Sequence, residues 1–359
     1  MNLPYLPLKF FLHTLFATLW VLFFTTGCNT STPKTYGQVT RSFYFWKTVF
    51  ALSAEQRNTL QQLNVERLYI KLFDVDWSAT RQAAVPIAPV RFEEPLPKAT
   101  DIVPVVYITN KTFVNLPDTL VAALADSVYH KMQTLLAASG TKKPSEIQFD
   151  CDWTSATAGK FFAFIRAFKL KLQPAQTLVS ATIRLHQVKY RSQTGIPPAD
   201  RGVLMFYNMG NFKDPNTNNS VLDLKEAKRY LQTLNQYPLP LDVALPLFSW
   251  GVVFRNGQFA NLINQLTTQT ANNLPQLLQP LGKGRYRALQ SGIINGSRVG
   301  KDDVVRVEEV PLPDALKAAS WLSKNIGTTN NLHVALYHLY PNVFENYPTP
   351  AIESIFNTF

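Results

Sequence analysis

Residues 146–154 (EIQFDCDWT) carry two carboxylates at a spacing that suits acid–base chemistry or polar binding. Successive side chains of an extended strand point to opposite faces, so Asp150 and Asp152 share one face. Two carboxylates on one face of an otherwise apolar strand are costly to desolvate, and they repel each other. A fold keeps such a pair most readily where a strand runs out into a polar pocket. We therefore predict a functional site at this strand end, with Asp150 and Asp152 as candidate catalytic residues.

Polar and aromatic side chains also gather where seven other short apolar runs end. These ends hold Trp46 and Lys47; Asp74, Asp76 and Trp77; Asn110; Arg184 and His186; Tyr207 and Asn208; Ser249 and Trp250; and His338 and Tyr340. Carboxylates and amides bind sugar hydroxyls, and aromatic rings stack on the apolar faces of sugars. We therefore expect a glycan ligand, with Asp76 as a third candidate catalytic carboxylate. The candidate substrate-binding residues are Trp46, Asp74, Asn110, Arg184, His186, Tyr207, Asn208 and Trp250.

The same residue types also suit structural roles. Asp74 and Asp76 can cap a loop, and Arg184 can neutralise the neighbouring aspartates through an ion pair. Trp46 and Trp250 can belong to the core or to a wall. The sequence leaves both kinds of role open.

The elements that must position these side chains alternate between strand and helix. The apolar runs are 42–48, 67–77, 102–109, 147–153, 178–186, 203–208, 242–250 and 332–340. Helical patterns lie between most of them, at 54–64 after the N-cap Ser53, 117–138, 158–172, 224–234 and 313–324. Near-continuous apolar strands suit a parallel sheet covered on both faces. The order predicts an α/β fold, a single (β/α)8 TIM barrel with the site at its C-terminal rim.

Two regions depart from this alternation. Residues 78–100 are proline-rich and show no helical period, and residues 274–311 are predicted to form a small β insertion before the last helix. The expected organisation is a signal peptide at 1–27, a tether at 28–40, the barrel at 41–345 and a C-terminal tail at 346–359.

The N-terminal residues have the layout of a secretory signal. Lys9 precedes an apolar run at 10–24, and small residues lead to Cys28. The segment resembles a bacterial lipoprotein signal, in which Cys28 becomes the lipid-attachment residue, although Thr25 stands where an aliphatic residue is usual. The alternative is an uncleaved anchor, for which the run is rather short. We expect a lipid-anchored protein of the cell envelope, in the outer membrane of a Gram-negative bacterium.

Composition excludes several classes of function. The chain of 359 residues is 46% hydrophobic and 16% charged, which is typical of a globular protein. Its net charge is +11, but the basic residues are scattered and no nucleic-acid-reading motif appears, so we expect no nucleic-acid partner. No convincing metal-ligand spacing or cofactor-binding glycine pattern is present, and we predict neither a metal nor a cofactor. Cys151, on the opposite strand face from the aspartates, is expected to be a small buried hydrophobe.

Three short motifs resemble the chitinase-type glycoside hydrolases of family 18. Residues 150–154 (DCDWT) match the D-x-D-W part of that family's fourth-strand motif D-x-x-D-x-D-W-E. Residues 205–208 (MFYN) resemble its sixth-strand M-x-Y-D, and 245–251 (LPLFSWG) weakly resemble its seventh-strand G-x-P-x-Y-G. The resemblance covers about residues 40–345 and implies a TIM barrel directed at a glycan. The chain also resembles uncharacterised barrel lipoproteins of Gram-negative bacteria.

The resemblance fails at the decisive position. Thr154 stands where the family places its catalytic glutamic acid, and Ile147 replaces the first aspartate. Asn208 replaces the carboxylate that follows the tyrosine. A threonine hydroxyl is too weak an acid to protonate a glycosidic oxygen at neutral pH, so the family mechanism does not carry over intact.

Three hypotheses follow. In a hydrolase with a relocated acid, burial and Asp150 would raise the pKa of Asp152, while Asp150 or Asp76 would act as the second carboxylate. Tyr207 and Arg184 would then orient the substrate. In the second hypothesis the protein is a carbohydrate-binding pseudo-enzyme, and in the third its barrel is only an assembly scaffold.

Overall fold

The computed structural model describes residues 37–140, 143–173, 176–327, 329–340 and 343–359. The predicted signal peptide, Cys28 and most of the predicted tether lie outside these described residues. Among the helices of the described ranges, none has the length and apolar character needed to cross a membrane.

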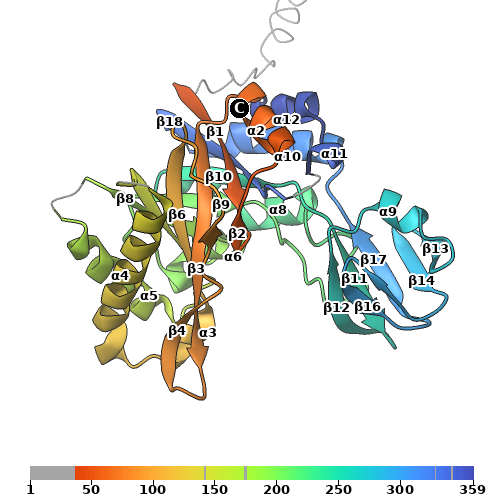
Figure 1. Cartoon of the computed structure of the whole chain (residues 1–359), viewed down its shortest axis with the longest axis horizontal. Helices are drawn as coiled ribbons and strands as arrows, with labels where there is room; N and C mark the ends of the chain where they lie inside the picture. Colours follow the sequence, from red (N-terminus) through yellow and green to blue (C-terminus); the bar gives the residue numbers. More distant parts are fainter. Residues whose placement is uncertain (1–36, 141–142, 174–175, 328, 341–342) are drawn as a thin grey trace, which may run out of the picture. The chain divides into compact units, whose positions relative to one another are not determined.

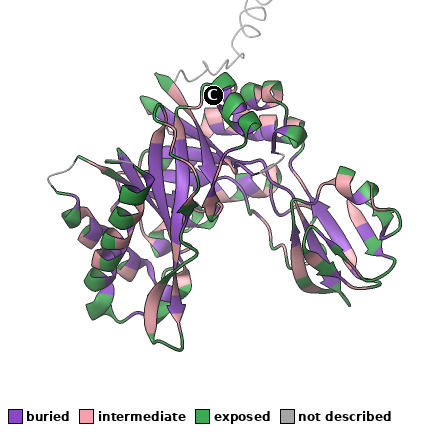
Figure 2. Cartoon of the chain, viewed as in Figure 1, coloured by how far each residue is buried: buried purple, intermediate pink, exposed green. Residues whose placement is uncertain are grey.

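Eight parallel strands form a closed barrel (Figure 1). They are β1 (Gln38–Phe45), β3 (Arg67–Ser78), β6 (Asp101–Ile108), β7 (Glu146–Asp150), β8 (Leu178–Ile183), β9 (Arg201–Met205), β10 (Leu241–Pro246) and β18 (Asn331–Tyr337). Each strand pairs with the next in this order, and β18 pairs with β1 to close the ring. The predicted (β/α)8 fold is therefore confirmed. Figure 2 shows these strands buried along most of their length, as expected for a sheet covered on both faces.

Helices occupy most of the connections between barrel strands. They are α2 (Ala54–Gln62), α3 (Asn110–Asn115), α4 (Val121–Ser139), α5 (Ala158–Lys171), α6 (Leu185–Lys189), α7 (Arg191–Thr194), α8 (Leu224–Tyr230) and α10 (Leu312–Asn325), with 3-10 turns η1 (Asp118–Leu120) and η2 (Leu234–Gln236). After the last barrel strand come α11 (Val343–Asn346) and α12 (Thr349–Phe356). Ser53 caps α2 as predicted, because its side chain accepts a hydrogen bond from the backbone N–H of Gln56. Gly140 ends α4 at φ 76°, a conformation that glycine adopts without strain.

The connection between β3 and β6 contains strands instead of a helix, in agreement with the absence of a helical period there. In this connection β4 (Ala83–Ile87) pairs antiparallel with β3, and β5 (Arg91–Phe92) pairs with β2 (Val49–Phe50).

A second sheet lies between β10 and α10 along the chain. Its strands are antiparallel, in the order β12 (Gln258–Asn264), β11 (Trp250–Arg255), β17 (Val304–Glu308), β14 (Arg285–Ala288) and β13 (Leu278–Gly282). It is accompanied by α9 (Thr268–Asn272) and by a hairpin of β15 (Gly292–Ile294) and β16 (Ser297–Val299). We call the segment from β11 to β17 the insertion.

The insertion begins earlier than the range 274–311 expected from sequence. The sequence predicts one strand over the apolar run 242–250, but β10 ends at Pro246 and Trp250 already belongs to β11. Both β11 and β12 pair within the second sheet, which places their hydrogen bonds outside the barrel.

The C-terminal residues 346–359, expected to be a tail, contain α12. Its Ile352 and Ile355 are fully buried, and the ring of Phe356 packs edge-to-face on Phe43 of β1 with 6.2 Å between ring centroids. An apolar helix face of this kind is stabilised by packing on the barrel.

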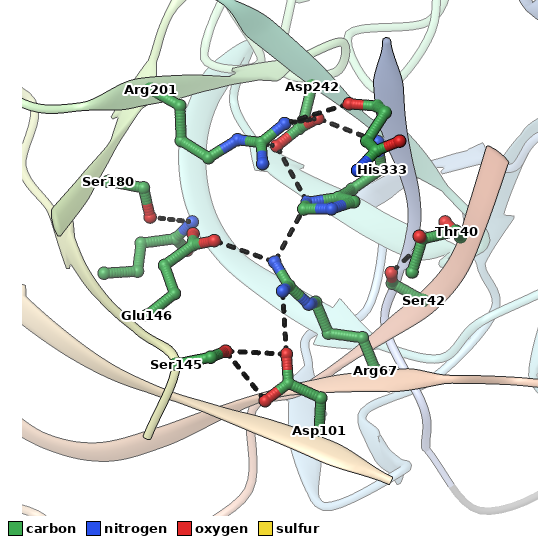
Figure 3. Close-up of polar contacts among 12 residues, drawn as sticks. Thr40, Ser42, Arg67, Asp101, Ser145, Glu146, Ser180, Arg201, Asp242 and His333 are labelled. Carbon is green, nitrogen blue, oxygen red and sulfur yellow. Dashed lines mark hydrogen bonds and ion pairs between the residues drawn. The ribbon is translucent and has the colours of Figure 1, made fainter. Parts of the chain in front are cut away.

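A network of buried and partly buried charges lies at the N-terminal end of the barrel (Figure 3). Arg67 lies 2.7 Å from the carboxylates of both Asp101 and Glu146, and Arg201 lies 2.7 Å from that of Asp242. His333 Nδ1 links the two groups, at 2.9 Å from Arg67 Nη1 and 3.1 Å from Asp242 Oδ2. Ion pairs occupy this end of the barrel interior, so the opposite rim is the place to look for a site.

Candidate functional site

Asp150 and Asp152 meet one arginine at the C-terminal rim of the barrel. Asp150 is the last residue of β7, and Arg184 follows the end of β8. The Arg184 Nη2 lies 3.1 Å from Asp150 Oδ1, and its Nε donates to Asp152 Oδ1. The Thr182 hydroxyl also donates to Asp150 Oδ1, at 2.5 Å. The arginine therefore bridges the two carboxylates, as the ion-pair alternative for Arg184 predicted.

The two aspartates differ in how far they are buried. The side chain of Asp150 is 4% exposed, whereas that of Asp152 is 48% exposed. Burial raises the pKa of Asp150; the Arg184 charge opposes this rise and the Asp152 charge adds to it. The relocated-hydrolase hypothesis required burial at Asp152, and the structure places it at Asp150 instead, because the chain leaves the barrel interior at the end of β7.

A cavity of about 360 Å³ opens beside Asp152. It brings together five of the predicted site residues, namely Asp152, Arg184, His186, Tyr207 and Asn208, and Tyr230 of α8 adds a further ring. Burial lowers the pKa of His186, so its imidazole is neutral at neutral pH. The lining thus combines one half-exposed carboxylate with hydroxyl, amide and imidazole groups.

A row of aromatic rings crosses the same end of the barrel. Tyr207 stacks on Tyr337 with centroids 4.9 Å apart, and Tyr337 also lies 5.7 Å from Trp46 and 5.8 Å from Phe248. Phe248 in turn lies 5.4 Å from Trp250. The predicted Trp46 and Trp250 are therefore members of this row and do not line the cavity itself. Tyr337 was missed from sequence, although its position at the end of β18 could have indicated it.

The remaining predicted residues form separate contacts. Asp74 lies 2.9 Å from Lys71 Nζ. Asp76 accepts a hydrogen bond from the Thr109 hydroxyl at 2.8 Å, which lowers the pKa of Asp76. Asn110 Oδ1 accepts from the Thr157 hydroxyl at 2.6 Å. Asp74, Asp76 and Asn110 do not line the cavity beside Asp152 in the described part of the chain.

Among the described residues, the side-chain hydrogen-bond partner of Thr154 is Thr157 and not an acidic group. Its backbone N–H donates to the Thr157 hydroxyl at 2.9 Å, and its own hydroxyl lies 3.4 Å from the same oxygen. This position supplies hydroxyl groups where the resemblance expects a carboxylic acid. Cys151 is fully buried, as predicted.

The described residues contain no group of three or more histidine, cysteine, aspartate or glutamate side chains arranged to hold a metal ion.

Comparisons with known proteins identify the fold. No family model matches the sequence, and no curated protein matches it. The spore cortex-lytic enzyme SleL of Bacillus megaterium QM B1551 aligns with a TM-score of 0.54 and 15% identity, covering 91% of this chain and 75% of that chain. The GH18 chitinase ChiB of Flavobacterium johnsoniae gives 0.52 and 13%, covering 89% and 94%, and a chitinase of Chromobacterium violaceum ATCC 12472 gives 0.50 and 14%, covering 88% and 98%. The chain has the TIM-barrel fold of these chitinase-like proteins.

Proposed function

We propose that this protein binds a glycan at the C-terminal rim of its barrel and does not cleave it. The observation that carries the proposal is the bridge from Arg184 to Asp150 and Asp152. This bridge engages both carboxylates on which a relocated acid–base mechanism would depend.

The state of each rim carboxylate argues against hydrolysis. A general acid must hold a proton within reach of the leaving oxygen. The raised pKa of Asp150 favours a proton there, but this side chain is buried beneath Thr182 and Arg184. Asp76 has a lowered pKa and is therefore an anion at neutral pH. Asp152 is accessible, but its Oδ1 accepts a hydrogen bond from Arg184 Nε.

The cavity chemistry supports a glycan as the ligand. Sugar hydroxyls need closely spaced donors and acceptors, which Asp152, His186 and Asn208 supply. The ring of Tyr207 lies in the lining, and the row of aromatic rings continues from it. The solved structures that share this fold are named as chitinases and a spore cortex-lytic enzyme, which also favours a glycan.

The test is a panel of chito-oligosaccharides, peptidoglycan fragments and other oligosaccharides, applied to protein that begins at Asn29. Calorimetric titration measures binding, and release of reducing ends after long incubation measures cleavage. We expect binding of at least one glycan, no released ends, and loss of binding in Asp152→Asn. Released ends that disappear in Asp152→Asn would establish a hydrolase instead.

We also propose that Cys28 carries a lipid that anchors the protein in the outer membrane. The support is the order of Lys9, the apolar run 10–24 and Cys28. Labelling of cells with a radioactive fatty acid should mark the wild-type protein and not Cys28→Ala. Equal labelling of both proteins, or recovery of the wild type in a soluble fraction without label, would contradict the anchor.

A further inference from the structure

One wall of the cavity beside Asp152 has no regular secondary structure of its own. Tyr207 and residues 208–211 line this wall, within the long connection from β9 to α8. A wall made of a loop keeps its shape only if other elements hold its backbone.

The loop is held first by its own returning segment. The backbone N–H of Asn208 donates to Val221 O at 3.0 Å, and that of Met209 donates to Ser220 O at 2.8 Å. The position of Ser220 and Val221 therefore sets the position of two wall residues.

Ser220 is in turn held by the insertion. Glu308, the last residue of β17, accepts hydrogen bonds from both the backbone N–H of Ser220, at 2.9 Å, and its hydroxyl. The same carboxylate oxygen accepts from Trp250 Nε1 at 2.8 Å. A direct chain of contacts thus runs from Glu308 through Ser220 to Met209 in the cavity wall.

Arg306 holds the same loop at a second place. Its Nη2 donates to Phe212 O at 2.8 Å, and its Nη1 donates to Asp214 O at 2.7 Å. Its Nε donates to Glu308 Oε1 at 2.7 Å. The two residues that hold the loop, Arg306 and Glu308, therefore form one ion pair. The planar guanidinium suits this task, because it offers several donors in a fixed geometry.

The pair is fully buried, with both side chains 0% exposed. A buried ion pair gains little net stability over well-packed apolar groups of similar size, because both charges must be desolvated. Its four hydrogen bonds to the loop give it a positional role that apolar groups could not supply.

We infer that Arg306 and Glu308 are positioning residues for the glycan cavity, acting from the insertion through the loop 208–222. This inference rests on the proposed glycan site. The two side chains do not line the cavity, so their effect passes through the backbone of the wall.

The test compares the double variant Arg306→Met/Glu308→Leu with Arg255→Met. Arg255 forms the other arginine–carboxylate pair of the insertion, at 2.9 Å from Asp303, and makes no hydrogen bond to the loop among the described residues. Hydrogen exchange measured on the full protein reports the amides of Asn208 and Met209 directly. We expect these amides to lose protection in the double variant and to keep it in Arg255→Met, while both variants retain a cooperative unfolding transition.

Binding affinity is measured by titration with a glycan from the panel that the wild type binds, such as a chito-oligosaccharide. We expect the double variant to bind at least about tenfold more weakly, Arg255→Met to bind normally, and Glu308→Gln, which still accepts from Ser220, to lie between them. Unchanged protection of the two amides in the folded double variant would overturn the inference whether or not a glycan is known. Normal binding by that variant would also overturn it and leave the proposed function standing, whereas failure of the wild type to bind any glycan would count against the proposed function alone.

Discussion

Each end of the barrel holds an arginine that bridges two carboxylates, but the surroundings of the two bridges differ. At the N-terminal end Arg67 contacts Asp101 and Glu146, whose side chains are 34% and 1% exposed. At the C-terminal end Arg184 contacts Asp150 and Asp152, and Asp152 is 48% exposed beside a cavity. One bridge belongs to a network that continues through His333 to Asp242 (Figure 3), and the other borders a ligand-sized space.

The two arginine–carboxylate bridges therefore have different roles. Where a buried carboxylate such as Glu146 pairs with an arginine, removing one partner leaves an unpaired buried charge. Where one carboxylate remains half-exposed, its free oxygen can accept a hydrogen bond from a ligand. Mutation of Glu146 should therefore change stability, and mutation of Asp152 should change binding.

The largest expected effect is at Glu146. Glu146→Leu removes one partner of a buried ion pair and should lower the free energy of unfolding by about 3–5 kcal/mol. Urea unfolding followed by circular dichroism measures this change.

Its control is the double variant Arg67→Met/Glu146→Leu, which removes both charges. If the double variant recovers most of the lost free energy of unfolding, the loss in Glu146→Leu comes from the unpaired charge of Arg67. A double variant as unstable as the single one would instead indicate that the network cannot be replaced by apolar packing.

A smaller effect is expected from His338, which follows the C-terminal end of β18. Burial, with a contribution from the Lys47 charge, lowers the pKa of His338 from 6.5 to about 4. The unfolded chain therefore takes up this proton at a higher pH than the folded protein does. The resulting stabilisation is present above pH 6.5 and is lost as the pH falls towards about 4, amounting to about 3 kcal/mol.

His338→Gln should flatten the pH dependence of unfolding in that window. The control is His130→Gln, because the side chain of His130 is 74% exposed. The same slope in wild type and His338→Gln would show that another group is responsible for the acid sensitivity.

The smallest effect on stability is expected at Asp152. Asp152→Asn weakens a half-exposed ion pair, so the free energy of unfolding should change by less than about 1 kcal/mol. Thermal unfolding at neutral pH checks this value. A loss as large as that of Glu146→Leu would remove the proposed contrast between the two ends.

Much of the fold could be predicted from local patterns. The strand-length apolar runs predicted the eight barrel strands. The strand predicted over 147–153 is shorter in the structure, because β7 ends at Asp150 and Asp152 follows it. Closure of the barrel then brings His186 and Tyr207 to the same rim, because all parallel strands end there.

The rest depends on contacts between distant segments. Glu308 and Ser220 are separated by 88 positions, and nothing in the local pattern of β17 indicates that its carboxylate holds a barrel loop. The start of the insertion at Trp250 was also hidden, because an apolar residue suits either sheet. Arg184 could be recognised as a rim residue, but only its position between the two carboxylates distinguishes a bridge from a free ligand contact.

The most direct test is a parallel titration of wild type, Asp152→Asn and Glu146→Gln with the same set of glycans under conditions where all three proteins are folded. We expect Asp152→Asn to bind the glycan at least about tenfold more weakly than the wild type. Glu146→Gln should bind as the wild type does and only unfold more easily. Equal loss of affinity in both variants, or binding that survives in Asp152→Asn, would contradict the assignment of the C-terminal rim as the binding site.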